Sequence, residues 1–143
     1  MTDKWGRRLF KTGAVWLVVM GLVHSLSLIR DLAPSNDTER QLVDLMTNYH
    51  FNLMGSLRTM GELNRGFSIA FMLAALGFGV LSLTLARERA GLLKSVALVN
   101  VVWLAAMLAT SLRYFFAVPT SFLALGLAIF VAAWMKLPGE AAS

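Results

Sequence analysis

The chain has 143 residues, of which 57% are hydrophobic and only 15% are charged. A soluble domain usually carries about 25% charged residues, so this composition excludes an ordinary water-soluble protein. The net charge is +5, but the basic residues gather at the ends of apolar blocks, which is typical of membrane proteins and not of nucleic-acid binding. Cysteine is absent, which excludes disulfides, thiolate metal sites and iron–sulfur clusters. The length predicts a single domain, 1–143.

A short basic segment, 1–11, precedes the first apolar block, at about 12–29. A cleaved signal peptide begins in the same way. This block is longer than the usual signal-peptide core, contains His24 near its end and lacks a cleavage site between small residues. We therefore predict that it is retained as the first membrane span.

The only long connector covers about 31–65 and begins with a turn at 34–37 that offers good helix N-caps. Apolar residues then recur at steps of three and four: Leu42, Met46, Tyr49, Leu53, Leu57 and Met60. This spacing predicts an amphipathic helix, bent near Gly55 and Gly61, that lies along the membrane surface or caps the bundle.

Three further apolar blocks follow, at about 66–86, 92–112 and 120–137. Each is close to the ~20 residues that a helix needs to cross the hydrocarbon core. Alanines at four-residue steps permit close packing between such helices. The predicted fold is all-α: an integral membrane antiparallel four-helix bundle with an amphipathic helical connector between spans one and two.

The basic residues also predict an orientation. They are densest in the N-terminal segment, in the link between spans two and three, and beside the C-terminal tail. The long connector mixes its arginines with acidic residues. Because Lys and Arg in short flanks mark the cytoplasmic side, we expect both termini to be cytoplasmic and the connector to be extracytoplasmic.

The densest set of polar residues lies where the connector enters span two. Arg58, Glu62 and Arg65 are spaced by four and three residues, which on a helix would place them along one side. Asn64 and Arg113 are expected at a similar level. The arginines could hold a carboxylate or a phosphate head group, with Glu62 tuning them or acting as a base. The alternative is an ion-pair ladder on the surface.

Two polar residues lie within the spans. His24 is an ionisable group inside a membrane helix, which is a functional hypothesis by default, although a neutral histidine bonded to Ser25, Ser27 or a neighbouring helix is the alternative. Asn100 could contact a ligand or form a hydrogen bond between helices. No catalytic, phosphate-binding or dinucleotide motif occurs, and we predict no catalytic residue, no metal ligand and no cofactor.

The stretch from Phe51 to Phe67 resembles a family of small bacterial four-span membrane proteins that have no assigned function. The matching residues are Phe51, Met54, Gly55, Arg58, Thr59, Glu62, Gly66 and Phe67. Gly61 and Asn64 stand where the family has aromatic residues, so the resemblance does not imply a ligand held by ring stacking. It implies a four-span fold in the bacterial inner membrane and no particular activity.

Three functions fit these observations. The first is a non-enzymatic bundle that binds a lipid or an amphipathic small molecule, with the polar head near His24, Arg58, Glu62 and Arg65. The second is an accessory subunit of a larger membrane complex. The third is an enzyme that modifies a lipid or isoprenoid, with Glu62 and His24 as an acid–base pair. The expected partners are membrane lipids and either a larger membrane protein or further copies of the chain, with no nucleic acid.

Overall fold

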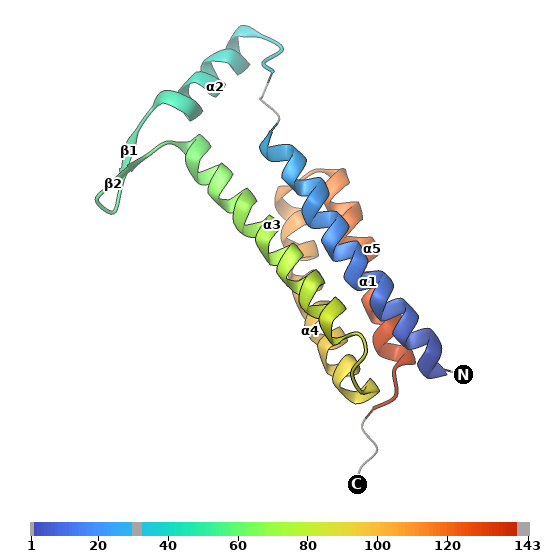
Figure 1. The fold of residues 1–143 in the computed structure, drawn as a ribbon. Helices are drawn as coiled ribbons and strands as arrows, with labels where there is room; N and C mark the ends of the chain where they lie inside the picture. The colour runs from blue at the N-terminus through green and yellow to red at the C-terminus, as the bar shows by residue number, and fades with distance from the viewer. Residues whose placement is uncertain (1, 30–32, 140–143) are drawn as a thin grey trace. The chain divides into compact units, whose positions relative to one another are not determined.

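The computed structural model describes residues 2–29 and 33–139 of the chain. Arg30 and Asp31, at the predicted end of span one, lie outside the described residues. The elements, labelled in Figure 1, are α1 (Thr2–Ser25), the 3-10 helix η1 (Leu26–Leu28), α2 (Asp37–Asn48), β1 (Phe51–Leu53), β2 (Ser56–Arg58), α3 (Met60–Leu85), α4 (Ala90–Tyr114) and α5 (Ala117–Lys136).

Within the described residues, four helical segments are long and apolar enough to cross a membrane. They are Asp3–Leu28, Met60–Leu85, Ala90–Tyr114 and Ala117–Lys136. At most a third of the most apolar window of each is buried inside the protein. Large apolar side chains such as Leu22, Leu73 and Val102 are more than half exposed, as expected where lipid covers the surface. The chain is a small integral membrane protein of four candidate spans, and the predicted all-α fold is confirmed.

The described chain falls into two compact units. The first contains 2–20 and 75–139, and thus most of α1, the second half of α3, and all of α4 and α5. The second contains 21–29 and 33–74, and thus the end of α1, the connector and the first half of α3. Each unit is described separately below.

In the first unit, α1 and α5 pack antiparallel along a row of aromatic contacts. The rings of Phe10 and Phe130 meet edge to face at 5.9 Å between centroids. Further along, Trp16 stacks on Phe122 at 5.1 Å and donates its indole N–H to the Phe122 carbonyl at 3.0 Å. Phe10 and Phe130 are fully buried. Aromatic rings packed in this way anchor a helix pair through large buried area and defined geometry.

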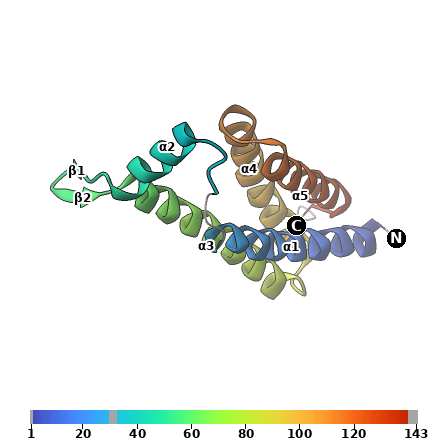
Figure 2. The same ribbon diagram turned by 90° about the horizontal axis from the view of Figure 1, so that it is seen from above.

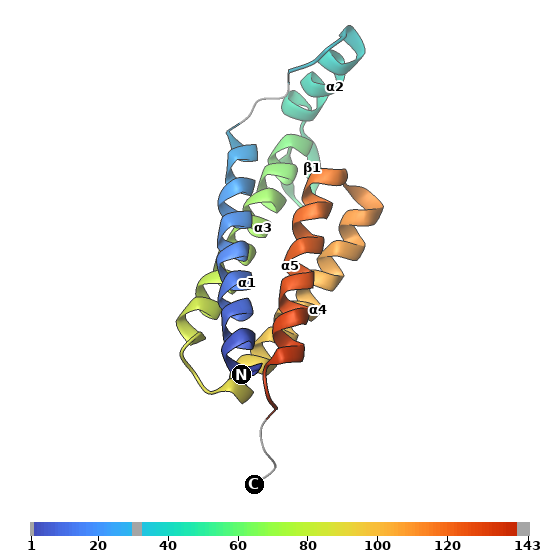
Figure 3. The same cartoon turned by 90° about the vertical axis from the view of Figure 1, so that its right-hand side faces the viewer.

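The other contacts of the first unit complete an antiparallel arrangement. Phe78 of α3 stacks on Trp103 of α4 at 4.9 Å. Near the α4–α5 turn, the hydroxyls of Ser111 and Thr120 are 2.8 Å apart. Figure 3 shows α4 and α5 as neighbours, and Figure 2 shows them from above. α3 and α4, and α4 and α5, are thus neighbours in space as well as in sequence, as short connections between antiparallel helices favour.

Both described ends of the chain lie at one end of the first unit. A Cβ atom added at Gly6 would be 3.0 Å from Leu137, so α1 begins where α5 ends. The Arg7 guanidinium donates to the Glu88 carbonyl at 2.7 Å, which brings the α3–α4 link to the same end. An even number of spans produces this arrangement, and it gathers the basic N-terminal segment, link and tail together.

In the second unit, α2 is a short amphipathic helix with a well-defined start. The Asn36 side chain accepts the Glu39 backbone N–H at 2.9 Å. In return the Glu39 carboxylate accepts the Ser35 N–H at 2.6 Å. This bond holds the pKa of Glu39 below its ordinary value, because it favours the charged form. The predicted amphipathic connector helix is confirmed in α2.

The helix is shorter than its apolar spacing predicts. It ends at Asn48, and Phe51–Leu53 pairs antiparallel with Ser56–Arg58 in a β-hairpin. At the hairpin turn Met54 has φ 50° and Gly55 has φ 90°, which no right-handed helix accepts. The Asn52 side chain accepts the Gly55 N–H at 2.8 Å and secures the turn. The prediction that a helix continues through Leu57 is therefore wrong.

Candidate functional site

The start of α3 is organised by a reciprocal pair of hydrogen bonds. The Thr59 hydroxyl accepts the Glu62 N–H at 3.1 Å, and the Glu62 carboxylate accepts the Thr59 N–H at 2.9 Å. This is a capping box, which satisfies two backbone donors at the beginning of a helix. Thr59 is almost fully buried. Glu62 therefore has a structural task, and one of its oxygens is already bonded.

Arg58 belongs to the hairpin, whereas Glu62 and Arg65 belong to the helix α3. Arg58 is the last residue of β2, and its guanidinium donates to the carbonyl of Leu57 at 2.9 Å. The predicted placement of the three residues along one helix face is wrong, because the helix begins only at Met60. The described residues contain no ion pair of Glu62 within 4.0 Å, so the surface ion-pair ladder that the sequence offered as an alternative is not formed there.

His24 lies against the first half of α3. Its ring meets the ring of Phe71 edge to face at 4.8 Å and also faces the backbone of Ser68. Its Nε2 atom is buried and has no hydrogen-bond partner in the described part of the chain. The neighbouring serines do not supply one, since Ser25 bonds the Leu22 carbonyl and Ser27 bonds the His24 carbonyl. A buried polar nitrogen without a partner costs about 1–3 kcal/mol.

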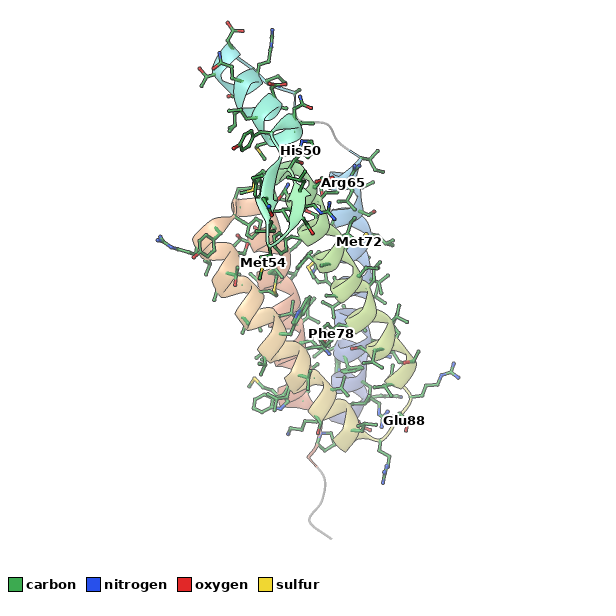
Figure 4. All side chains as sticks on the ribbon, turned by 90° about the vertical axis from the view of Figure 1, so that its left-hand side faces the viewer. His50, Met54, Arg65, Met72, Phe78 and Glu88 are labelled. Atoms are coloured by element: carbon green, nitrogen blue, oxygen red, sulfur yellow. The ribbon has the colours of Figure 1, made fainter. Side chains whose placement is uncertain are left out.

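Arg65, which precedes Phe71 on α3, also contacts the segment that follows α1. Its guanidinium donates to the Leu28 carbonyl at 3.3 Å, at the end of η1. The side chain is otherwise exposed (Figure 4). A guanidinium has five N–H donors, so most of them stay available. Asn64, the preceding residue on α3, is also exposed. His24 of α1 thus lies against α3, and Arg65 of α3 bonds the segment that follows α1, so both residues lie where these two segments meet.

A shallow apolar hollow lies between α2, the hairpin and the start of α3. Its volume is about 300 Å³, and it is lined by Leu45, Met46, Tyr49, Phe51 and Met60. Gly61 lies close beneath it: an added Cβ atom would be 3.0 Å from the Met46 carbonyl oxygen. Phe51 faces the same hollow as Leu45 and Met46 of α2, and Gly61 permits the close approach of α2 to α3.

Asn100 belongs to the first unit and is fully buried there. Its amide nitrogen donates to Ser82 Oγ at 3.1 Å and to the Val96 carbonyl at 3.0 Å. Its Oδ1 atom has no partner among the described residues. The bond to Ser82 joins α4 to α3, which is the interhelical role that the sequence offered as an alternative to ligand contact.

Arg113 also belongs to the first unit, in the last turn of α4. It is exposed, and its guanidinium lies 6.0 Å from the centre of the Tyr114 ring. A cation over an aromatic face is weakly attractive at an exposed site, worth about 0.5–1 kcal/mol. An arginine at a helix C-terminus also suits the negative end of the helix dipole.

Two contributors to this region were not singled out by sequence reasoning. Thr59 could have been found, because Thr59-Met60-Gly61-Glu62 has the capping-box spacing. Phe71 could not, since an aromatic residue in an apolar span is unexceptional until the register between α1 and α3 places it beside His24.

Comparison of the chain with protein-family models, with curated proteins and with solved structures finds no match. The established description is therefore that of an integral membrane protein with four candidate spans, four packed apolar helices and a short connector helix, without assignment to a family.

Proposed function

We propose that the protein is a non-enzymatic membrane protein that binds a lipid or an amphipathic small molecule, with an anionic head group near His24 and Arg65. The observation that carries the proposal is the buried Nε2 atom of His24, which lacks a partner in the described residues. A ligand oxygen would satisfy this atom and offset the cost of its burial.

The side chains of His24 and Arg65 together suit an anionic head group. A neutral imidazole donates a hydrogen bond at one ring nitrogen and accepts one at the other, and the His24 ring packs edge to face against Phe71. The Arg65 guanidinium supplies a permanent positive charge and spare donors. Phosphate and carboxylate oxygens match both groups. The apolar part of such a ligand would lie along the end of α1 and the first half of α3, which belong to the same unit.

The proposal assigns different roles to the other predicted site residues. Arg58 and Asn64 are exposed in the same unit and would contact a head group from outside. Glu62 is favoured as the cap of α3 rather than as a ligand contact, because its carboxylate already bonds the Thr59 N–H. Asn100 and Arg113 belong to the first unit and are not part of this head-group site; Asn100 bonds Ser82.

The capping role of Glu62 also weighs against the enzymatic alternative. A general base must be free to reach the proton that it removes. The bond from the Thr59 N–H holds one oxygen of Glu62 at the start of α3, so the orientation of this carboxylate is set by the capping box. The membrane assigned to the protein in this proposal is the bacterial inner membrane, as the resemblance of Phe51 to Phe67 implies.

The proposal places both termini in the cytoplasm. Support comes from the basic groups that the first unit gathers at one end: Arg7 bonds the α3–α4 link, and the Lys94 ammonium lies 5.7 Å from the Trp134 ring. Positively charged short flanks favour the cytoplasmic side. Reporter fusions at the C-terminus and within 38–40 test this orientation, because the two positions should report opposite sides.

Native mass spectrometry of the gently extracted protein tests the ligand. Two variants address the site, Arg65→Gln and His24→Phe, and two matched controls change the exposed residues of the same types, Arg40→Gln and His50→Phe. We expect wild type and controls to retain a bound lipid and the site variants to lose most of it. Equal retention by all five proteins would reject the site. A stoichiometric protein partner would instead support the accessory-subunit function.

A further inference from the structure

The turn at the tip of the β-hairpin has an unusual backbone conformation and a fully exposed apolar side chain. Met54 is 99% exposed and has a positive φ of 50°. The next residue, Gly55, has φ 90°, so both central residues of the turn adopt left-handed conformations. Such a turn normally carries Asn-Gly, Asp-Gly or Gly-Gly. Methionine tolerates this conformation poorly, and its thioether side chain gains nothing from complete exposure to water.

The surroundings of Met54 are apolar and uncharged. Leu53 and Leu57 flank the turn and are 43% and 62% exposed, and no charged residue occurs from 51 to 57. The nearest charge is Arg58, at the base of the hairpin. The Gly55 N–H is bonded internally by Asn52, which lowers the cost of moving the turn out of water. An apolar tip above a cationic base is suited to the boundary between acyl chains and head groups.

The hairpin is also directly connected to a candidate span, which keeps it close to that boundary. Only Thr59 separates β2 from α3, and α3 is a candidate span. In Figure 1 the hairpin projects sideways from the start of α3, and its tip lies lower in the view than the first turn of α3, on the side toward which the helix runs. Met54 stands near the level of Met72 in Figure 4, past the first turns of α3. Because α3 is a candidate span, a tip at this level lies at the depth of the first turns of that span.

We propose that the β-hairpin is a membrane anchor whose tip, Leu53, Met54 and Leu57, inserts into the bilayer at the connector side, with Arg58 at the level of the lipid phosphates. The occupant of this apolar surface is the bilayer itself, because the hairpin is tethered directly to a membrane span. The tip of this anchor is a separate surface from His24 and Arg65, so its insertion does not depend on the head-group site.

Site-directed fluorescence labelling tests the anchor, since the chain has no native cysteine. Three single-cysteine proteins carry the polarity-sensitive dye NBD: Met54→Cys, the exposed charged position Asp37→Cys, and the exposed span position Leu73→Cys. Each full-length protein is reconstituted in vesicles of phosphatidylcholine and phosphatidylglycerol. Quenching is measured with aqueous iodide and with lipids spin-labelled in their acyl chains.

We expect the label at Met54→Cys to resemble that at Leu73→Cys. Its emission should shift to shorter wavelength, iodide quenching should fall several-fold below that of Asp37→Cys, and spin-labelled lipid should quench it. Quenching by iodide as strong as at Asp37→Cys would overturn the proposal. Protection from iodide without quenching by lipid would also overturn it, because a second copy or another protein would then cover the tip.

A second variant guards against misfolding of the turn. Asparagine favours the left-handed conformation that Met54 occupies, so Met54→Asn keeps the hairpin while removing its apolar tip. With the dye placed at Leu57→Cys, we expect Met54→Asn to raise iodide quenching several-fold. No change in that quenching would overturn the insertion of the tip.

Discussion

Thr59 and Glu62 each bond the other's backbone amide, at 3.1 Å and 2.9 Å, immediately before α3. The pair fixes the point where the hairpin ends and a membrane helix begins. Because Thr59 is the only residue between β2 and α3, the capping box also sets the direction in which the hairpin leaves the helix. A local hydrogen-bond motif thus positions both the proposed anchor and Arg65.

The capping role predicts different effects for two substitutions of Glu62. Glu62→Ala removes the acceptor of the Thr59 N–H and should lower the free energy of unfolding by about 1 kcal/mol. Glu62→Gln keeps an acceptor of the same reach and should cost less than half as much. Reversible unfolding in mixed detergent micelles measures both. Equal losses would show that the charge of Glu62, and not its capping bond, is what matters.

Close packing of α1 and α3 predicts opposite outcomes for two neighbouring glycines of the first unit. A Cβ atom at Gly79 would lie 2.9 Å from the Val18 backbone nitrogen, whereas one at Gly77 would meet nothing within 4 Å. Gly79→Ala should therefore lower the free energy of unfolding by about 1–3 kcal/mol through overpacking. Gly77→Ala should leave stability unchanged or raise it by up to ~1 kcal/mol. Equal effects in the same micelle assay would contradict the packing of these helices.

The buried bond between Asn100 and Ser82 can be measured by a double-mutant cycle. Ser82→Ala removes the acceptor and should lower the free energy of unfolding by about 1 kcal/mol, leaving a buried N–H without that partner. Adding Asn100→Leu removes the buried amide and should recover most of the loss. Strictly additive effects would mean that the two side chains do not interact.

The start of α2 predicts a dependence on pH. The pKa of Glu39 is lowered because its carboxylate accepts the Ser35 N–H. A lowered pKa means that this bond stabilises α2 above the ordinary glutamate pKa and is lost as pH falls through the lower folded value. The chemical shift of the Ser35 amide proton should titrate with a midpoint below the ordinary glutamate value. Glu39→Gln should abolish the titration, and a midpoint at the ordinary value would contradict the bond.

Much of the fold was predictable from sequence, for identifiable reasons. Long apolar blocks bounded by basic residues indicated the spans, and the turn before Asp37 indicated the start of α2. The hairpin was not predictable from the apolar spacing, because Leu53 and Leu57 continue the helical period of α2. What interrupts the helix is the conformation of Met54 and Gly55, and Met-Gly is a much weaker turn signal than Asn-Gly.

The candidate site was predictable only in part. His24 and Arg65 could be singled out because charged and ionisable groups are rare at membrane helices. His24 and Arg65 lie near the same two segments because of the register between α1 and α3. This register puts Leu28 beside Arg65 and Phe71 beside His24. No pattern within either segment encodes that register. The sequence also placed Arg58 on one continuous helix with Glu62, whereas Arg58 is the last residue of β2.

Nitrogen-15 NMR of the imidazole rings tests the central claim most directly. The chain has only two histidines, and His50, which contacts the Asn48 carbonyl at 3.0 Å in the connector, is a built-in control. Purified delipidated protein is titrated with phosphatidylglycerol. We predict that the His24 Nε2 resonance shifts and saturates with added lipid, that His50 does not respond, and that Arg65→Gln abolishes the shift. A His24 resonance that stays unchanged, or that moves together with His50, would contradict a head-group site at His24 and Arg65.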